Sequence, residues 1–340
     1  MNADAPARFA FDAYVQAVDD AHRPALAYAA QPFAAWHATL RAKVMDLLGP
    51  LPARVALNAV IDATEEFPEY RQHHVVYQTA PGVEAPAYLL IPHGVDAARP
   101  APAILALHGH GDGKGQLVAR GEPPNLYASL ARRYAEAGFV VLVPDAIGFG
   151  ERAADFRRYG GRDGCNVNHL KLALFGRNLM ALNIWDDMRG LDFLASRPDV
   201  DAARLGCAGL SFGGTRTMYL AALDERVRAA LVSGYLTTFR AYAIDTGNFC
   251  GSQFLPGVYA WGDVADIHGL IAPRRLLIQA GRADRGFPIE ASRAAHAHLA
   301  RIYAAAGAAD RLERDEFNGG HEVNPAPVVA FMQRWLGRDV

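Results

Sequence analysis

The sequence Gly209-Leu210-Ser211-Phe212-Gly213 stands between an apolar segment and a segment with helical character, and this placement strongly constrains the fold. Residues 205–208 are short and apolar, as in a buried strand. A serine at such a strand-to-helix turn has a strained backbone that projects its hydroxyl above the sheet, and flanking glycines remove Cβ clashes. The pattern predicts that Ser211 is a nucleophile. A glycine-rich turn whose serine only caps the next helix would have the same letters.

Apolar strand-like runs and helical segments alternate along most of the chain. The expected strands are 74–79, 85–91, 103–107, 139–143, 205–208, 229–232, 276–280 and 311–317. The expected helices are 126–137, 179–195, 215–223, 288–306 and 325–336. Such alternation is typical of an α/β protein with a mainly parallel sheet, in which ligands bind beyond the carboxyl ends of the strands.

The first 50 residues differ from the rest of the chain. Apolar and aromatic side chains recur at helical spacing over residues 9–48, and Gly49-Pro50-Leu51-Pro52 ends that pattern. We therefore divide the chain into a helical N-terminal segment, residues 1–52, and an α/β domain, residues 53–340.

Composition and charge exclude several classes of partner. A formal net charge of -2, with basic residues scattered, gives no electrostatic footprint for nucleic acid. The apolar run 139–143 is far too short to cross a membrane, and the N-terminus lacks a secretory pattern, so we expect a cytoplasmic protein. Three cysteines in no metal-like spacing predict neither a disulfide framework nor a zinc site. The sequence leaves open whether the chain forms a homo-oligomer.

A serine hydroxyl needs a base, and among the 12 histidines the best placed is His321. It follows the last expected strand, within Asn318-Gly319-Gly320-His321-Glu322, and precedes the last expected helix. An exposed loop histidine is the alternative interpretation. In strand-turn-helix serine hydrolases the chain order is serine, acid, histidine, and that order favours His321 as the base.

The acid should follow a strand between the serine and the histidine. Asp284 ends the loop after the expected strand 276–280, and its carboxylate would orient the imidazole and stabilise the imidazolium. The rival aspartates are Asp263, Asp266, Asp310 and Asp315.

Developing negative charge on a substrate oxygen needs backbone N–H donors that are already in place. We assign the N–H of Phe212 and, from the glycine-rich loop His108-Gly109-His110-Gly111, the N–H of His110. The loop lacks the ending of a phosphate-binding P-loop. His108 and His110 have no third metal ligand at a recognisable spacing, so we expect loop-shaping roles and no metal or other cofactor.

Roles can also be predicted for one group of aromatic residues and one group of charged residues. The segment 233–262 is longer than a usual connection, and its aromatic side chains, with Tyr235, Phe239 and Tyr242 as the chosen candidates, are expected to narrow a substrate pocket. Charges in 144–152 are expected to be structural, and Asp186 is expected to pair with Arg189 along one helix.

With these residues in hand, the chain resembles the α/β-hydrolase superfamily from about Val75 onward. Within it, the chain is similar to dienelactone-hydrolase-like and acetyl xylan esterase-like bacterial serine hydrolases. The resemblance rests on HGHG at 108–111, PDAIGFGER at 144–152, GLSFGG at 209–214, APRRLLIQAGRAD at 272–284 and GGHE at 319–322. It implies an α/β-hydrolase fold with a mainly parallel, eight-stranded sheet flanked by helices.

Two departures limit what the resemblance implies. Acetyl xylan esterases of that family typically have GGSQGG at the turn, and dienelactone hydrolases are shorter and use a cysteine. We therefore predict a serine hydrolase that cleaves small carboxylic esters of short acyl groups, acetylated carbohydrates among them, through an acyl-enzyme. The alternatives are a peptidase or amidase of the same fold and, at lower weight, a catalytically silent binding protein.

Overall fold

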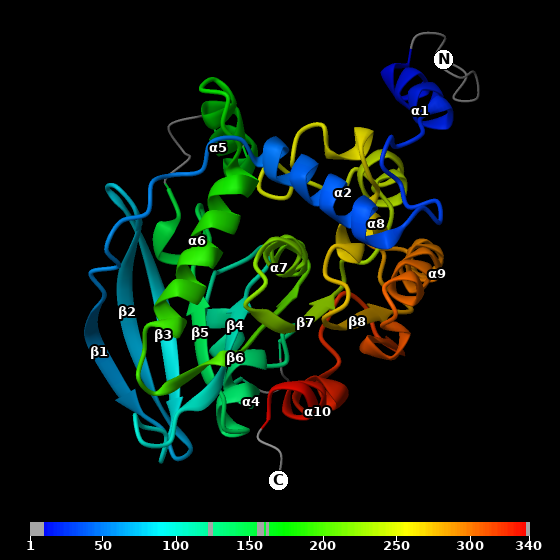
Figure 1. Ribbon diagram of the computed structural model, residues 1–340. Helices are drawn as coiled ribbons and strands as arrows, with labels where there is room; N and C mark the ends of the chain where they lie inside the picture. The colour runs from blue at the N-terminus through cyan, green and yellow to red at the C-terminus, as the bar shows by residue number, and fades with distance from the viewer. Residues whose placement is uncertain (1–9, 122–124, 155–159, 161–162, 338–340) are drawn as a thin grey trace.

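The computed structural model describes residues 10–121, 125–154, 160 and 163–337. Position 9, where the expected N-terminal helical pattern begins, lies outside these ranges. The described strands form one sheet in the order β1-β2-β3-β5-β4-β6-β7-β8-β9 (Figure 1). Their bounds are β1 Val60–Glu66, β2 Tyr70–Ala80, β3 Val83–Pro92, β4 Ala101–Leu107, β5 Val140–Pro144, β6 Val200–Leu210, β7 Val227–Ser233, β8 Arg275–Gly281 and β9 Leu312–Phe317.

The sheet is parallel through its larger part. Strands β5, β4, β6, β7, β8 and β9 run in the same direction, whereas β1, β2 and β3 extend it as an antiparallel edge. All eight expected strands are confirmed. The ninth, β1, was not predicted because each of its seven residues is exposed, so it lacks the apolar alternation by which strands are recognised.

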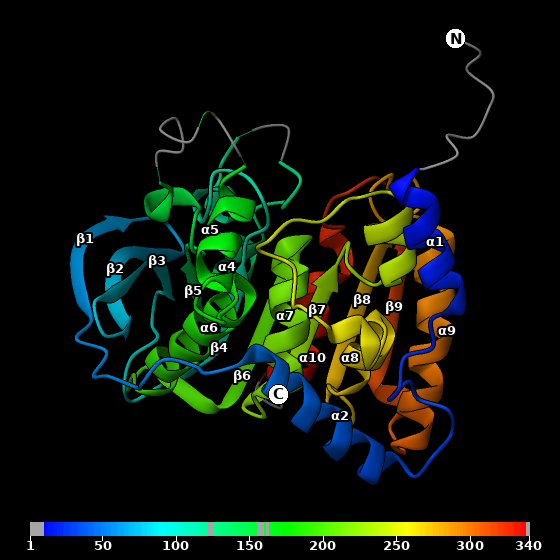
Figure 2. The ribbon, with the colours of Figure 1, turned by 90° about the horizontal axis from the view of Figure 1, so that it is seen from above.

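Helices cover both faces of the sheet (Figure 2). Their bounds are α1 Phe11–Ala21, α2 Phe33–Leu48, α3 Gly115–Val118, α4 Leu130–Glu136, α5 Gly164–Ala173, α6 Leu179–Ala195, α7 Phe212–Leu223, α8 Val264–Gly269, α9 Ile289–Ala305 and α10 Pro325–Leu336. One buried core lies between the sheet and side chains of α2, α6, α7, α8 and α9, and a second lies between the sheet and α3, α4 and α10.

The helix expected over residues 126–137 is shorter in the structure. Helix α4 begins only at Leu130, because Ala128 and Ser129 have left-handed backbone conformations with φ of 50° and 53°. An α-helix cannot propagate through such residues. Gly138 has φ of 94° and follows Ala137, the residue that caps the end of this helix.

The N-terminal segment contains the two helices that its pattern predicted. Helix α2 ends at Leu48, and Gly49 caps it with φ of 72°. Its buried face consists of Trp36, Leu40, Val44 and Leu48, which join the same core as α7 and α8. Among the described residues, no helix is long and apolar enough to cross a membrane.

Candidate active site

Ser211 lies on the sharp turn between β6 and α7, at the carboxyl end of a central strand. Its backbone has φ of 61° and ψ of -123°, and its N–H donates to the Ser233 carbonyl at 3.0 Å. Glycine is required on both sides: a Cβ on Gly213 would overlap the Leu107 carbonyl, and one on Gly209 would overlap the Gly213 carbonyl. The serine side chain makes no capping hydrogen bond to α7. The geometry therefore favours a nucleophile that lines a cavity over a helix cap.

His321 and Asp284 come together although 37 residues separate them. The imidazole Nδ1 lies 2.7 Å from Asp284 Oδ2, and the carboxylate is almost completely buried. The other carboxylate oxygen, Oδ1, accepts hydrogen bonds from the N–H groups of Gly286 and Phe287 at 2.9 and 3.0 Å. Both oxygens are thus held in place. This arrangement leaves Nε2 as the imidazole nitrogen available to take a proton.

The imidazole ring of His321 is fixed by packing. The Phe287 ring is stacked on it with centroids 5.2 Å apart and planes inclined by 15°. On another side lies Gly234, where an added Cβ would be 3.0 Å from the ring. Gly234 directly follows Ser233, the residue whose carbonyl accepts the Ser211 N–H. The ring and the serine are therefore held against the same short stretch at the end of β7.

The four rival aspartates have other partners. Asp263 caps α8, Asp266 accepts from Tyr28 N–H and contacts His298, Asp310 lies by Arg275 at the surface, and Asp315 accepts from Gln279 and Asn324. None of these contacts involves His321. Asp284, which follows β8 and lies between Ser211 and His321 in the chain, contacts the His321 ring.

The loop after β4 is held in shape by buried polar groups. Burial lowers the pKa of His108 to about 3, so its imidazole is neutral. As a neutral ring it donates from Nδ1 to the Gly109 carbonyl at 2.7 Å and accepts at Nε2 from the Ala146 N–H at 3.0 Å. Asp145 accepts from both the N–H and the Nζ of Lys114, at 2.7 and 2.6 Å. These contacts join the loop to the segment after β5, as the structural interpretation of residues 144–152 predicted.

The two residues that would supply the oxyanion donors have their rings in contact. Phe212 is the first residue of α7, where backbone N–H groups have no acceptor within the helix. The ring of His110 lies 5.4 Å from the Phe212 ring, and His110 lines the same cavity as Ser211. The N–H of Gly109 donates to the Tyr127 hydroxyl at 2.9 Å and is therefore already engaged. This leaves the His110 N–H as the better placed donor of the loop.

A cavity of about 230 Å³ lies at Ser211. Its lining residues are His110, Asp163, Ser211, Gly247, Asn248, Phe249, Cys250, Gln253 and Phe287. The 233–262 segment thus contributes to the wall, but through residues 247–253. Sequence reasoning did not identify Asn248, Gln253 and Phe287, because no motif marks them.

The three chosen aromatic residues require a correction. Tyr235, Phe239 and Tyr242 are buried and do not line the cavity at Ser211. Tyr235 and Tyr242 instead pack against Phe287, behind the wall, with ring centroids 5.9 and 5.8 Å from it. Phe239 and Tyr242 line a neighbouring cavity of about 470 Å³ beside α1. An aromatic residue in a loop between strands is as readily a core residue as a ligand contact, and sequence spacing does not distinguish the two.

A buried ion pair beneath the serine turn was also not predicted. Arg216, one turn into α7, donates from Nε to Asp187 Oδ2 of α6 at 2.9 Å, and both side chains are almost completely buried. The expected pairing of Asp186 with Arg189 is wrong: Asp186 pairs with Arg152 at 2.6 Å, and Arg189 pairs instead with Asp192 of the same helix.

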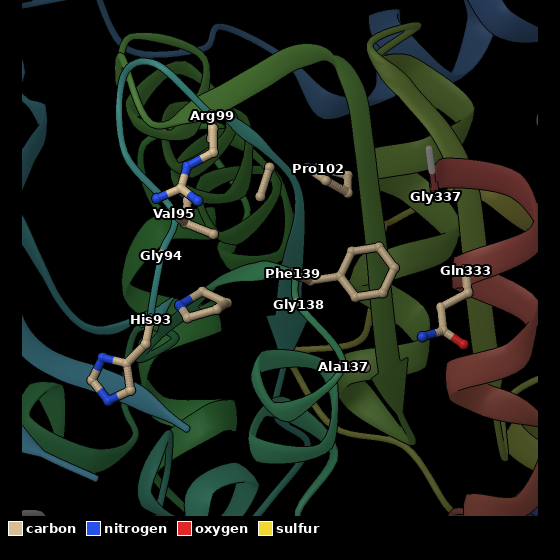
Figure 3. Close-up of a pocket in the computed structure, with 12 residues that line it drawn as sticks. His93, Gly94, Val95, Arg99, Pro102, Ala137, Gly138, Phe139, Gln333 and Gly337 are labelled. Atoms are coloured by element: carbon tan, nitrogen blue, oxygen red, sulfur yellow. The ribbon is translucent and has the colours of Figure 1, made fainter. Parts of the chain in front are cut away.

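A larger cavity, about 610 Å³, lies elsewhere (Figure 3). Its lining comes from the amino ends of β4 and β5 and from α10, and includes His93, Arg99, Phe139 and Gln333. Parallel strands place their loops for chemistry at the carboxyl ends, so this cavity is at the opposite end of the sheet from Ser211.

Comparisons with known proteins agree with this geometry. Residues 10–315 match the model of the Abhydrolase family, and the chain belongs to that family. It is 28% identical over 307 residues to a Bacillus subtilis (strain 168) protein assigned as the hydrolase YtaP, covering 87% of this chain and 98% of that protein.

Solved structures of esterases share the fold. A Bacteroides fragilis NCTC 9343 protein assigned as an acetyl xylan esterase has a TM-score of 0.75 at 20% identity, covering 93% of this chain and 84% of that one. The glucuronoyl esterase from Solibacter usitatus has a TM-score of 0.67 at 17% identity, covering 92% and 97%. The acetyl xylan esterase from Paenibacillus sp. R4 has a TM-score of 0.63 at 22% identity, covering 95% and 99%. The chain is thus an α/β-hydrolase in fold and family.

Proposed function

We propose that this protein hydrolyses carboxylic esters through an acyl-enzyme formed on Ser211. The observation that carries the proposal is the 2.7 Å contact between a buried Asp284 carboxylate and His321, whose ring packs beside the serine turn. A carboxylate that orients an imidazole beside a serine activates the hydroxyl as a nucleophile.

The proposed reaction has two halves. His321 takes the hydroxyl proton while Ser211 attacks the ester carbonyl, and the N–H groups of Phe212 and His110 stabilise the negative oxygen. His321 then donates its proton to the departing alcohol, which leaves an acyl-serine. Water attacks this acyl group with His321 again as the base, and His321 returns that proton to the Ser211 oxygen as the acyl–serine bond breaks and the free acid departs. Asp284 stays ionised throughout and stabilises the imidazolium.

The cavity favours small acyl groups. The cavity at Ser211 has a volume of about 230 Å³ and is walled by Phe249 and Phe287, which leaves room for a short acyl chain. Gly247 and Phe249 also line the neighbouring cavity of about 470 Å³, which offers space for a larger alcohol. The names of the structural neighbours, acetyl xylan and glucuronoyl esterases, support a carbohydrate ester as the substrate class. The proposed partner is therefore a small-molecule ester.

We place this activity in the cytoplasm. The three cysteines, Cys165, Cys207 and Cys250, are all free thiols, which is the state that a reducing compartment maintains.

Two measurements test the function together. Turnover is measured on p-nitrophenyl acetate, on acetylated xylo-oligosaccharides and on aminoacyl p-nitroanilides, and a fluorophosphonate probe is mapped by peptide mass spectrometry. We expect ester turnover, little amide turnover and a single modified peptide that contains Ser211. Modification of a different serine would refute the nucleophile assignment, and preferential anilide cleavage would identify a peptidase or amidase instead.

A further inference from the structure

Three side chains with metal-binding atoms meet beside the Ser211 cavity. His110 comes from the loop after β4, Cys165 from the first turn of α5, and Cys250 from the segment that follows the short π-helix Arg240–Asp245. The ligand atoms of all three lie within 4.8 Å of one another. His110 Nε2 is 3.0 Å from the Cys250 sulfur and 3.8 Å from the Cys165 sulfur.

We propose that these three residues form a binding site for a thiophilic divalent cation, with Zn²⁺ as the expected ion. Zinc binds thiolate and imidazole at about 2.3 and 2.0 Å in a tetrahedral arrangement, which places neighbouring ligand atoms about 3.4 to 3.8 Å apart. The 3.8 Å between His110 Nε2 and the Cys165 sulfur matches this spacing, and the 3.0 Å to the Cys250 sulfur is shorter, so a bound ion would move these two atoms apart. Two sulfurs and one nitrogen favour zinc over magnesium or calcium, which prefer oxygen.

The backbone around Cys250 holds the two sulfurs together. The N–H of Gly251 donates to Asn166 Oδ1 at 2.9 Å, which joins the segment to α5. Gly251 packs so closely on α5 that a Cβ there would overlap His169 and approach the Cys165 carbonyl at 2.7 Å. The two cysteines are therefore brought together by tight backbone packing as well as by their own contact.

The third member of the cluster, His110, is restrained by aromatic packing. The His110 ring is held between Phe149 and Phe212, with centroids 5.3 and 5.4 Å away.

Three protein ligands leave a fourth position of the tetrahedron open. His110 and Cys250 both line the cavity that contains Ser211, so an ion on them lies at its wall, with Asp163 on the same wall. A zinc ion there would reduce the space for the acyl group and would restrain the His110 loop. We infer that zinc inhibits the hydrolase reversibly. This consequence rests on the proposed function, whereas ion binding itself does not.

No sequence pattern indicates this site. Cys165 follows His110 by 55 residues, and Cys250 follows His110 by 140 residues. Zinc sites are recognised in a sequence by short spacings between ligands, and here each ligand comes from a separate segment of the chain. The expectation of no metal was drawn from that missing spacing.

Ion binding is tested without any substrate. The full chain, reduced with a phosphine and freed of metal, is titrated with Co²⁺ and then Zn²⁺, and thiolate-to-cobalt charge-transfer absorption is recorded. We expect one Co²⁺ per chain, displaced by Zn²⁺. Cys165→Ala and Cys250→Ala should each weaken Zn²⁺ binding by 100-fold or more, roughly the loss of one zinc ligand. Cys207→Ala, a buried cysteine in β6 remote from the cluster, is the matched control and should bind normally.

Equal binding by the wild type and the Cys165→Ala/Cys250→Ala double variant would overturn the site. Alkylation of Cys165 and Cys250 by iodoacetamide gives a second readout, because bound zinc should protect both thiols. The inhibitory role is tested separately, as the ratio of ester turnover without and with Zn²⁺ in each variant. If Zn²⁺ binds but does not inhibit ester turnover, only the regulatory role is refuted. If Zn²⁺ binds and the protein shows no ester turnover at all, the proposed function is refuted and the metal site stands.

Discussion

One end of the central sheet has the larger cavity, whereas the other end has the reactive residues. The amino end has the larger cavity, about 610 Å³, but glycine, proline, alanine and one phenylalanine make up most of its wall. The carboxyl end has only about 230 Å³ at Ser211, yet it brings together a strained serine, a buried carboxylate that holds a half-buried imidazole, and Cys250. This difference shows that, in a parallel sheet, the position of the reactive site follows from the carboxyl ends of the strands. The size of a cavity does not determine it.

Removing the nucleophile should have the largest effect. Ser211→Ala should lower ester turnover by about 10³- to 10⁶-fold, the range seen when a triad member is lost. The fold should remain, because the hydroxyl makes no capping bond to α7. Turnover and far-ultraviolet circular dichroism are measured on the same preparation. Activity near that of the wild type would mean that the chemistry at the carboxyl end uses another group.

Neutralising the orienting carboxylate should have the next largest effect. Asp284→Asn should reduce kcat by about 10²- to 10⁴-fold with little change in KM, because the amide cannot stabilise the imidazolium. Asp310→Asn is the matched control, since Asp310 is an exposed aspartate paired with Arg275 at the surface. Steady-state kinetics of both variants are compared. Equal losses in the two would remove the special role of the buried pair.

Acyl-chain length should have a moderate effect. Acetate and propionate esters should have kcat/KM values about tenfold or more above that of octanoate, because a cavity of this size has no extended groove to compensate the ordering of a long chain. A series of p-nitrophenyl esters from two to eight carbons measures the trend. A steady rise through octanoate would show an open, lipase-like pocket at the carboxyl end.

A change at the amino end should have the smallest effect. Arg99 lines the larger cavity, and its side chain is exposed, with Asp96 3.5 Å away. Arg99→Ala should change kcat/KM by less than about twofold and stability by no more than about 0.5 kcal/mol, as is usual for surface substitutions. Ester kinetics and thermal unfolding are recorded together. A tenfold loss of activity would show that the two ends are coupled and would break the contrast between them.

Much of this architecture was predictable because its signals are local. Strands β4, β5 and β7 have nearly continuous apolar runs, helices α6, α7 and α10 have apolar residues at helical spacing, and glycines mark the turn around Ser211. The order of Ser211, Asp284 and His321 along the chain also follows from the fold class. Edge strand β1 was missed because it has no buried face.

The rest of the site depends on contacts between distant segments. Phe287 stacks on His321 from a loop 34 residues earlier, and Tyr235 supports Phe287 from yet another loop. The His110, Cys165 and Cys250 cluster draws on three loops. No periodicity or motif links such residues, so only the folded arrangement shows which aromatic side chains face the cavity and which lie behind it.

The buried Asp187–Arg216 pair has a consequence for how such a sequence can diverge. Arg216 belongs to the helix that starts at Ser211, and Asp187 to the helix beside it, so the pair joins the two helices under the reactive turn. Losing one charge of a buried pair costs about 3 to 5 kcal/mol, whereas replacing both with apolar groups of similar volume is often neutral. Replacing Asp187 or Arg216 alone is therefore strongly destabilising, whereas replacing both together is tolerated. These two positions should change together over evolutionary time, as one inherited unit.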